Sequence, residues 1–238
     1  MIARGLRQGF LRLLFAIQPE ASPSNSVALN RSKLRPSSLL AGILFPIFCL
    51  LFSGAALGQW VVPVIPGPGP NTAVGIGNNC FEMTNGGGQR GVIWNANTLN
   101  LANPFNIGFS VRFDTWGADG LAMVLQNAGT NATGAGGNAL GFGDAIPADP
   151  NYGAITQSIA FELDTWNNTG AGIADIPQDH IAIHQNGNTT VASAGPVNAL
   201  ALGSDVTDNV CRRMRVTWEP TTNTISIFFR RQFRLSAN

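Results

Sequence analysis

The sequence predicts an all-β protein, an antiparallel β-sandwich or jelly roll, for three reasons. Apolar residues alternate with small or polar ones in several short segments after residue 58, which is the period of a strand. No segment in that region has the 3.6-residue period of an amphipathic helix. Loops rich in Gly, Asn and Pro separate the segments, as in sandwiches and barrels built from short strands.

The predicted strands follow one another along the chain after the Pro/Gly-rich stretch 59–79, which we interpret as a lead-in. Each shows alternation of large apolar residues with smaller or polar ones; they span residues 107–113, 159–163, 181–183, 214–218 and 225–229. Residues 219–223, Glu-Pro-Thr-Thr-Asn, have turn composition. They predict that 213–230 forms a β-hairpin.

Charge excludes several classes of protein. Charged residues make up 11% of the 238, against about 25% in ordinary domains, which excludes a coiled coil, a disordered charged tail and a long solvated helix. Residues 1–58 carry a net charge of +5, whereas residues 59–238 carry −4, with eight Arg and no Lys. Because a negative domain repels phosphate backbones, we expect no nucleic-acid partner.

Residues 1–58 have the layout of an export signal with a long basic region. Six basic residues precede or flank the start of an apolar run at 39–56, and Ala56-Leu57-Gly58 resembles a signal-peptidase site, with Gln59 as the new N-terminus. The alternative is a transmembrane anchor, because 18 apolar residues approach the length of a span. Pro46 and the small residues after the run favour cleavage. We therefore expect a secreted or cell-surface protein that meets the membrane only through this signal.

Two cysteines remain outside the signal, Cys80 and Cys211. An even number of cysteines in an exported chain favours one disulfide. The alternative is two unpaired, buried thiols.

One segment, residues 159–183, holds most of the candidate chemistry. Glu162 and Asp164 lie two apart on a predicted strand and so share a face, and no Lys or Arg lies between Arg112 and Arg212 to separate their charges. Oxygen ligands from Asp164, Asn168 and Asp175 suit Ca²⁺. A set of carboxylates with an imidazole suits Mn²⁺ or another transition metal; its members are Glu162, Asp164, Asp175 and His180. The alternative is a solvated acidic loop with an ordinary surface histidine.

Three motifs in this order resemble the legume-type (L-type) lectins. The first is Glu162-Leu-Asp164-Thr-Trp166-Asn-Asn168, followed by Asp175 and by His180-Ile-Ala-Ile. The second is Gly-Ala-Asp119-Gly-Leu-Ala at 117–122, and the third is the glycine-rich stretch at 134–141. The resemblance implies a concanavalin-like jelly roll at 80–238, incomplete at the C-terminus because the family continues for a few more strands. It also implies a bacterial exported member.

The resemblance implies a role for each metal residue. Asp164 and Asp175 bridge two ions. Glu162 and His180 complete the transition-metal site, and Asn168 with the Trp166 carbonyl completes the Ca²⁺ site. In the family these ions do no chemistry and hold the loop in place. Asp179 has no role in this pattern, and we expect His184 at the surface of a strand.

The resemblance also implies a sugar site, and glycans as partners. Asp119 accepts hydrogen bonds from sugar hydroxyls with the help of a cis peptide after Ala118. Gly137 donates a backbone N–H, Trp166 stacks on the sugar and the Asn168 amide faces it. An additional residue in the glycine-rich loop leaves Gly136 as an alternative to Gly137.

Two other functions compete with a non-catalytic lectin. One is a glycoside hydrolase on a similar jelly roll that uses Glu162 and Asp164, although no further carboxylate follows until Asp175. The other is a structural or adhesive surface protein whose sugar site has decayed.

Overall fold

The structure is a computed structural model that describes residues 10–13, 60–65, 70–115, 117–144, 153–171, 173, 175–199, 206–229 and 233–237. For 10–13 and 233–237 it describes the backbone. Nearly all regular structure is strand, with 3-10 turns at Gly137–Ala139 and Thr169–Ala171. No helix in the described part is long and apolar enough to cross a membrane.

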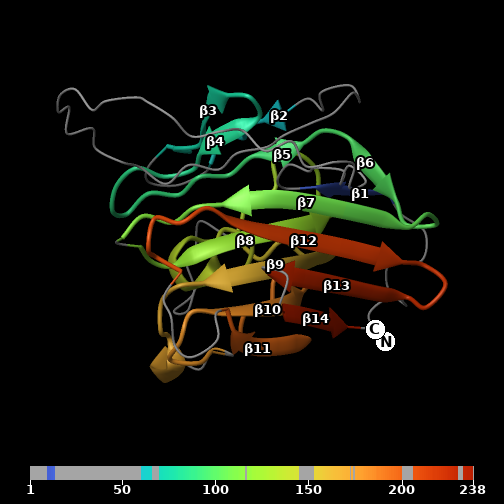
Figure 1. Cartoon of the computed structure of the whole chain (residues 1–238). Helices are drawn as coiled ribbons and strands as arrows, with labels where there is room; N and C mark the ends of the chain where they lie inside the picture. Colours follow the sequence, from blue (N-terminus) through green and yellow to red (C-terminus); the bar gives the residue numbers. More distant parts are fainter. Residues whose placement is uncertain are drawn as a thin grey trace, which may run out of the picture.

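Two antiparallel sheets make up the sandwich (Figure 1). The six-stranded sheet runs β11 (Ala194–Asn198), β10 (His180–Gln185), β9 (Ser158–Asp164), β8 (Gly120–Gln126), β1 (Phe10–Leu13) and β6 (Thr98–Asn100). The four-stranded sheet runs β14 (Phe233–Ala237), β13 (Thr224–Phe229), β12 (Arg212–Glu219) and β7 (Phe105–Val111). The predicted all-β fold and the predicted hairpin at 213–230 are confirmed, with Glu219 opposite Thr224 at the turn.

Alternation along the strands builds the core between the sheets. In β12 every second residue is buried, from Arg212 to Trp218. Met214 pairs with Phe109 of β7 and Phe229 of β13, so that apolar side chains meet across three strands. The six-stranded sheet contributes buried residues of β8, β9 and β10 to the same cluster: Met123, Leu125, Phe161, Leu163, Ile181 and Ile183.

Strand β9 is buried on both of its faces, the one in the sandwich core and the one that carries Glu162 and Asp164. All seven residues of β9 are buried. Ala135, Ala139 and Phe142 in the glycine-rich loop are also buried, and the loop is closed by backbone hydrogen bonds, among them Gly134 N–H to Gly141 O at 2.7 Å. The face that carries Glu162 and Asp164 therefore lies inside the protein.

The described residues of the stretch expected as a lead-in, 60–65 and 70–79, include short strands. Two small sheets pair it with the following segment: β2 (Trp60–Val61) with β5 (Trp94–Asn95), and β3 (Val74–Gly77) with β4 (Cys80–Glu82). Ile65 and Ala73 are buried in the main core. Apolar residues of this stretch therefore pack in the core although its sequence is rich in proline and glycine.

Four residues of the expected export signal are described. Phe10–Leu13 form β1, which pairs with β6 through Phe10, Leu11 and Arg12 and with β8 through Arg12 and Leu13. The rest of 1–58, including the apolar run and the expected cleavage site, lies outside the described residues.

The expected Cys80–Cys211 disulfide is wrong for this structure. Both thiols are free, Cys80 buried and Cys211 exposed. Cys80 begins β4 of a small sheet and its Sγ lies 3.7 Å from the Asn78 carbonyl oxygen, whereas Cys211 precedes β12 of the four-stranded sheet. The two thiols therefore lie in different environments, one buried beside a small sheet and one exposed before β12.

Candidate functional site

Small neighbours make room for the two carboxylates of β9. Glu162 lies opposite Ala122 on β8 and Ala182 on β10, and Asp164 lies opposite Gly120 and His180. Both acids are buried, Glu162 with only 4% of its surface exposed. Larger cross-strand neighbours would fill this face, so the Ala and Gly partners leave the space that the two acids occupy.

Gly120 brings the backbone of β8 against the end of β9. Its φ is +142°, and a Cβ at this position would overlap the carbonyl oxygen of Leu163 and lie 2.9 Å from the Asp164 Cα. Only glycine fits this approach. The preceding Ala118–Asp119 peptide is cis, as the resemblance implies. The Asp119 carbonyl accepts a hydrogen bond from Thr165 N–H at 2.9 Å, which joins this turn to the loop after β9.

Two histidines converge on Glu162. The Nε2 atoms of His180 and His184 lie 3.5 and 2.8 Å from the same oxygen, Oε1. Burial alone would raise the pKa of Glu162, but hydrogen bonding and charge from His180 and His184 hold that pKa below its usual value. Burial would lower the pKa of each histidine, and the neighbouring Glu162 outweighs it and raises both. The expectation that His184 lies at the surface is wrong, since it is 0% exposed.

Asp164 and Asp175 order the loop that follows β9. Asp164 Oδ1 accepts a hydrogen bond from Trp166 N–H at 2.7 Å, and Asp175 Oδ2 accepts one from Asn168 N–H. The pKa of Asp164 is raised to about 7, mainly by burial; the charges of Glu162 and Asp175 add to the rise, and Trp166 N–H and His180 oppose it. The raised pKa means that a negative charge on Asp164 is unfavourable in this site unless a positive charge lies near it.

The predicted metal residues are gathered in one place, although no three His, Cys, Asp or Glu side chains of the described residues are close enough together to hold an ion. Several of their polar atoms are buried without a hydrogen-bond partner among the described residues: Asn168 Oδ1, Asp175 Oδ1 and His180 Nε2. Asp175 Oδ1 lies 3.4 Å from His180 Nδ1. Buried atoms of this kind normally have partners. Buried oxygen and imidazole nitrogen atoms that lack hydrogen-bond partners are suitable ligands for a cation.

The predicted sugar residues surround the same loop. Asp119 is half-buried, and burial raises its pKa. Its Oδ2 lies 3.8 Å from the position that a Cβ would take at Gly137, whereas the corresponding position at Gly136 faces Arg90. Trp166 is 56% exposed. The structure thus places Gly137, and not Gly136, beside Asp119.

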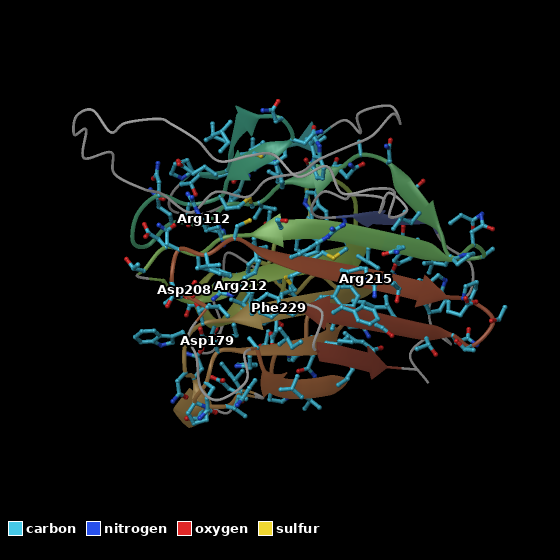
Figure 2. All side chains as sticks on the ribbon, viewed as in Figure 1. Arg112, Asp179, Asp208, Arg212, Arg215 and Phe229 are labelled. Atoms are coloured by element: carbon cyan, nitrogen blue, oxygen red, sulfur yellow. The ribbon has the colours of Figure 1, made fainter. Side chains whose placement is uncertain are left out.

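Two residues near the site have roles that sequence reasoning missed. Arg90 donates from Nη1 to the Gly134 carbonyl at 3.1 Å and so supports the glycine-rich loop. Asp179, which had no assigned role, accepts a hydrogen bond from Val206 N–H at 2.7 Å (Asp179 is labelled in Figure 2). Its carbonyl accepts another from Ala199 N–H. Asp179 therefore fastens the segments that flank 200–205 to the start of β10.

Comparison with known proteins agrees with these motifs. The sequence pattern of the legume lectin domain family matches residues 76–236, more than half of the chain. Among solved structures, the chain is similar to peanut lectin with a nine-residue peptide (PVIWSSATG), with 19% sequence identity and a TM-score of 0.41. That match covers 56% of this chain and 53% of the peanut lectin chain, so the chain spans about half the length of that lectin.

Proposed function

Because the chain belongs to the legume lectin domain family, we propose that it is an exported, calcium-dependent carbohydrate-binding protein without catalytic activity. One observation carries the proposal. The Asp119 carboxylate faces the backbone of Gly137, and the turn that holds it is bonded to the loop between Asp164 and Trp166. A sugar acceptor, a backbone donor and a candidate metal loop are thus held together.

The candidate metal residues divide by donor type. Asp164, Asp175, Asn168 and the Trp166 carbonyl would hold Ca²⁺, which takes oxygen ligands. Glu162, Asp164, Asp175 and His180 would hold Mn²⁺ or another transition metal. Bound ions would supply positive charge, so the β9 carboxylates, which otherwise repel one another, would act as ligands. The chain's own contribution is the set of hydrogen bonds that orders Trp166 and Asn168 in the loop and joins Thr165 to the Asp119 turn.

Each sugar contact in the proposal uses a different kind of group. The Asp119 carboxylate accepts hydrogen bonds from two hydroxyls, and Gly137 N–H and the Asn168 amide donate to sugar oxygens. Trp166, exposed at the rim, offers an aromatic face to the apolar face of a sugar ring. Glycans or glycoconjugates are the proposed partners.

Burial argues against the hydrolase alternative. Glycoside hydrolysis needs two carboxyl groups that flank the bond being broken. Glu162 is 4% exposed and is held between two imidazoles, and Asp164 is buried as well. Neither acid lies where a glycosidic bond can reach it, so the site favours binding over hydrolysis.

Thermal unfolding with and without a chelator tests the proposal. We expect the melting temperature of the full chain to fall in excess EDTA and to recover when Ca²⁺ is added, because an ion that binds the native state stabilises it. Asp164→Asn abolishes this dependence, and Asp144→Asn, in an exposed loop, retains it. A glycan array run with Ca²⁺ then tests sugar binding. Unchanged melting in EDTA rejects the metal sites, and metal-dependent melting without any glycan signal favours a structural or adhesive protein.

Export is tested separately by the mass of the protein recovered outside the cell. Cleavage after Gly58 predicts a mature chain that begins at Gln59. A product that retains Phe10–Leu13 contradicts cleavage and instead identifies β1 as a strand of the exported domain.

A further inference from the structure

His184 is a buried histidine to which the lectin pattern assigns no role. The chain has two histidines, and they lie four residues apart on β10, so both project from the same face of the sheet. Between them stands Ala182, which pairs directly with Glu162 on β9. The small alanine leaves Glu162 flanked by one imidazole on each side.

Hydrogen bonding fixes the orientation of the His184 ring. Nδ1 lies 2.8 Å from the Asn188 carbonyl oxygen, which can only accept, so Nδ1 carries a proton and donates it. Asn188 is itself held by its N–H to Gln185 O at 3.0 Å, and its side-chain oxygen accepts from Thr190 and Val191. The Phe142 ring packs 6.0 Å from the imidazole. In the neutral ring, the free electron pair is therefore on Nε2.

That electron pair lies against a carboxylate. Nε2 of His184 is 2.8 Å from Glu162 Oε1, yet both Nε2 atoms, of His180 and His184, are buried and have no partner with hydrogen-bond geometry among the described residues. Two electron-pair donors at this separation repel each other unless a proton or a metal ion lies between them, so the contact is either an ion pair with a protonated His184 or a shared metal ligation. His180 Nε2 approaches the same oxygen at 3.5 Å, so the two imidazoles share one carboxylate oxygen.

We propose that His184 is a direct ligand of the transition-metal ion, so that two imidazoles and carboxylates hold it. This inference rests on the proposed metal site and adds a ligand to it. The Asn188 carbonyl then has the function that an outer hydrogen-bond partner has for a metal-bound histidine, which is to fix the tautomer and aim the other nitrogen. A second imidazole shifts metal preference away from Mn²⁺ and toward Zn²⁺, Co²⁺ or Ni²⁺, because nitrogen donors suit the later metals.

The test uses the full chain, freed of metal with a chelator and then loaded with Ca²⁺ and one transition ion. Titration calorimetry measures the affinities for Mn²⁺, Co²⁺ and Zn²⁺, and pulsed electron paramagnetic resonance on the Cu²⁺-loaded chain counts coordinated imidazoles. We expect tighter binding of Zn²⁺ and Co²⁺ than of Mn²⁺, and two imidazoles. His184→Gln lowers the count to one and weakens Zn²⁺ binding roughly ten- to a hundredfold, while Ca²⁺ still raises the melting temperature.

The imidazole count is the deciding measurement, because a histidine that only positions Glu162 also weakens metal binding when it is replaced. His180→Gln is the matched control and also removes one imidazole. A count of one in the parent chain overturns the inference, makes His184 the ion-pair partner of Glu162 and leaves the proposed function intact. Absence of any transition-metal binding by the parent overturns both the inference and the two-metal site. Because the parent chain alone gives these answers, they do not depend on the folding of His184→Gln.

Discussion

The carboxylate of Asp119 faces the backbone of Gly137, with Oδ2 3.8 Å from the place where a Cβ of residue 137 would stand. The two residues come from different segments, the turn before β8 and the 3-10 turn of the glycine-rich loop. One provides a charged acceptor and the other a backbone that no side chain covers. Their proximity is the basis for the first two predictions.

Replacing Asp119 with Asn weakens glycan binding without weakening the metal site. The substitution keeps the shape of the side chain but removes charge from bonds to sugar hydroxyls, each worth about 1.5–3 kcal/mol, so affinity falls tenfold to a few hundredfold. Glycan-array titration measures the loss, and calcium-dependent melting stays as in the parent. Glu219→Gln is the control, because it also removes one carboxylate but at an exposed position. Glu219 ends β12, whereas Arg212 at the other end of that strand pairs with Val111 of β7, the strand that precedes the Asp119 turn in the chain. Unchanged glycan binding by Asp119→Asn removes Asp119 from the sugar site.

Alanine at Gly137 weakens glycan binding more than alanine at Gly136. Gly137 has a φ of +62°, where a side chain costs about 1–2 kcal/mol, and its Cβ points toward Asp119. Gly136 has φ −81° and ψ −167°, which alanine adopts freely, and its Cβ meets Arg90. Affinity measured for both variants against one glycan separates them. The reverse order assigns the sugar contact to Gly136.

Asn168→Ala reduces both glycan binding and calcium-dependent stability. Its Oδ1 is buried without a hydrogen-bond partner among the described residues, and its N–H donates to Asp175. In the proposal the side-chain amide serves the ion with its oxygen and the sugar with its nitrogen, so one substitution removes both. Asn167→Ala, at the exposed neighbour whose Oδ1 accepts from Thr169 N–H, is the matched control. A variant at Asn168 that melts with the parent's full calcium dependence contradicts the shared role.

Alternation of residues predicted the segments that form β7, β9, β10, β12 and β13, but it did not predict β8 or β11. The metal residues, assigned from their spacing between Glu162 and His180, stay a prediction. His184 was misplaced because its burial depends on a distant loop. The period of β10 puts it on the same face as His180, but it is Phe142 of the glycine-rich loop that packs near its ring. The pairing of Cys80 with Cys211 failed for a related reason. A count of thiols carries no information on which sheet each strand joins.

The glycine of the Ala-Asp-Gly turn is required by the backbone. In Gly120→Ala the new methyl group overlaps the Leu163 carbonyl, so β8 must separate from β9 at the point where Asp119 and Asp164 are held together. We expect a loss of stability of at least about 2 kcal/mol, within the range of severe backbone substitutions, together with loss of calcium-dependent melting. Gly87→Ala, where nothing lies within 4 Å of the added Cβ, stays within about 0.5 kcal/mol of the parent. Equal denaturation midpoints for the two variants contradict this account.

The last prediction concerns the ion pair between Asp208 and Arg212, which lie together at the start of β12 (Figure 2). The Arg212 guanidinium is buried; it donates to both carboxylate oxygens of Asp208 and to the carbonyls of Val206 and Val210 at 3.0 and 3.2 Å. The hydrogen bonds from Arg212 hold the pKa of Asp208 below its usual 3.8. A carboxylate with a lowered folded-state pKa adds stability above its unfolded pKa, and that stability is lost as pH falls through the folded value.

Asp208→Asn therefore destabilises the protein at neutral pH and has progressively less effect in acid. Because the Asp208 side chain is 41% exposed, the expected loss at pH 7 is only about 1 kcal/mol, the upper end for pairs that solvent reaches. Urea unfolding of parent and variant between pH 7 and pH 3 measures the difference, which should stay constant down to about pH 4 and then shrink. Asp144→Asn, an exposed aspartate, provides the baseline for removal of one negative charge. A stability difference that grows as pH falls reverses the predicted sign and excludes Asp208 as the carboxylate whose charge stabilises Arg212.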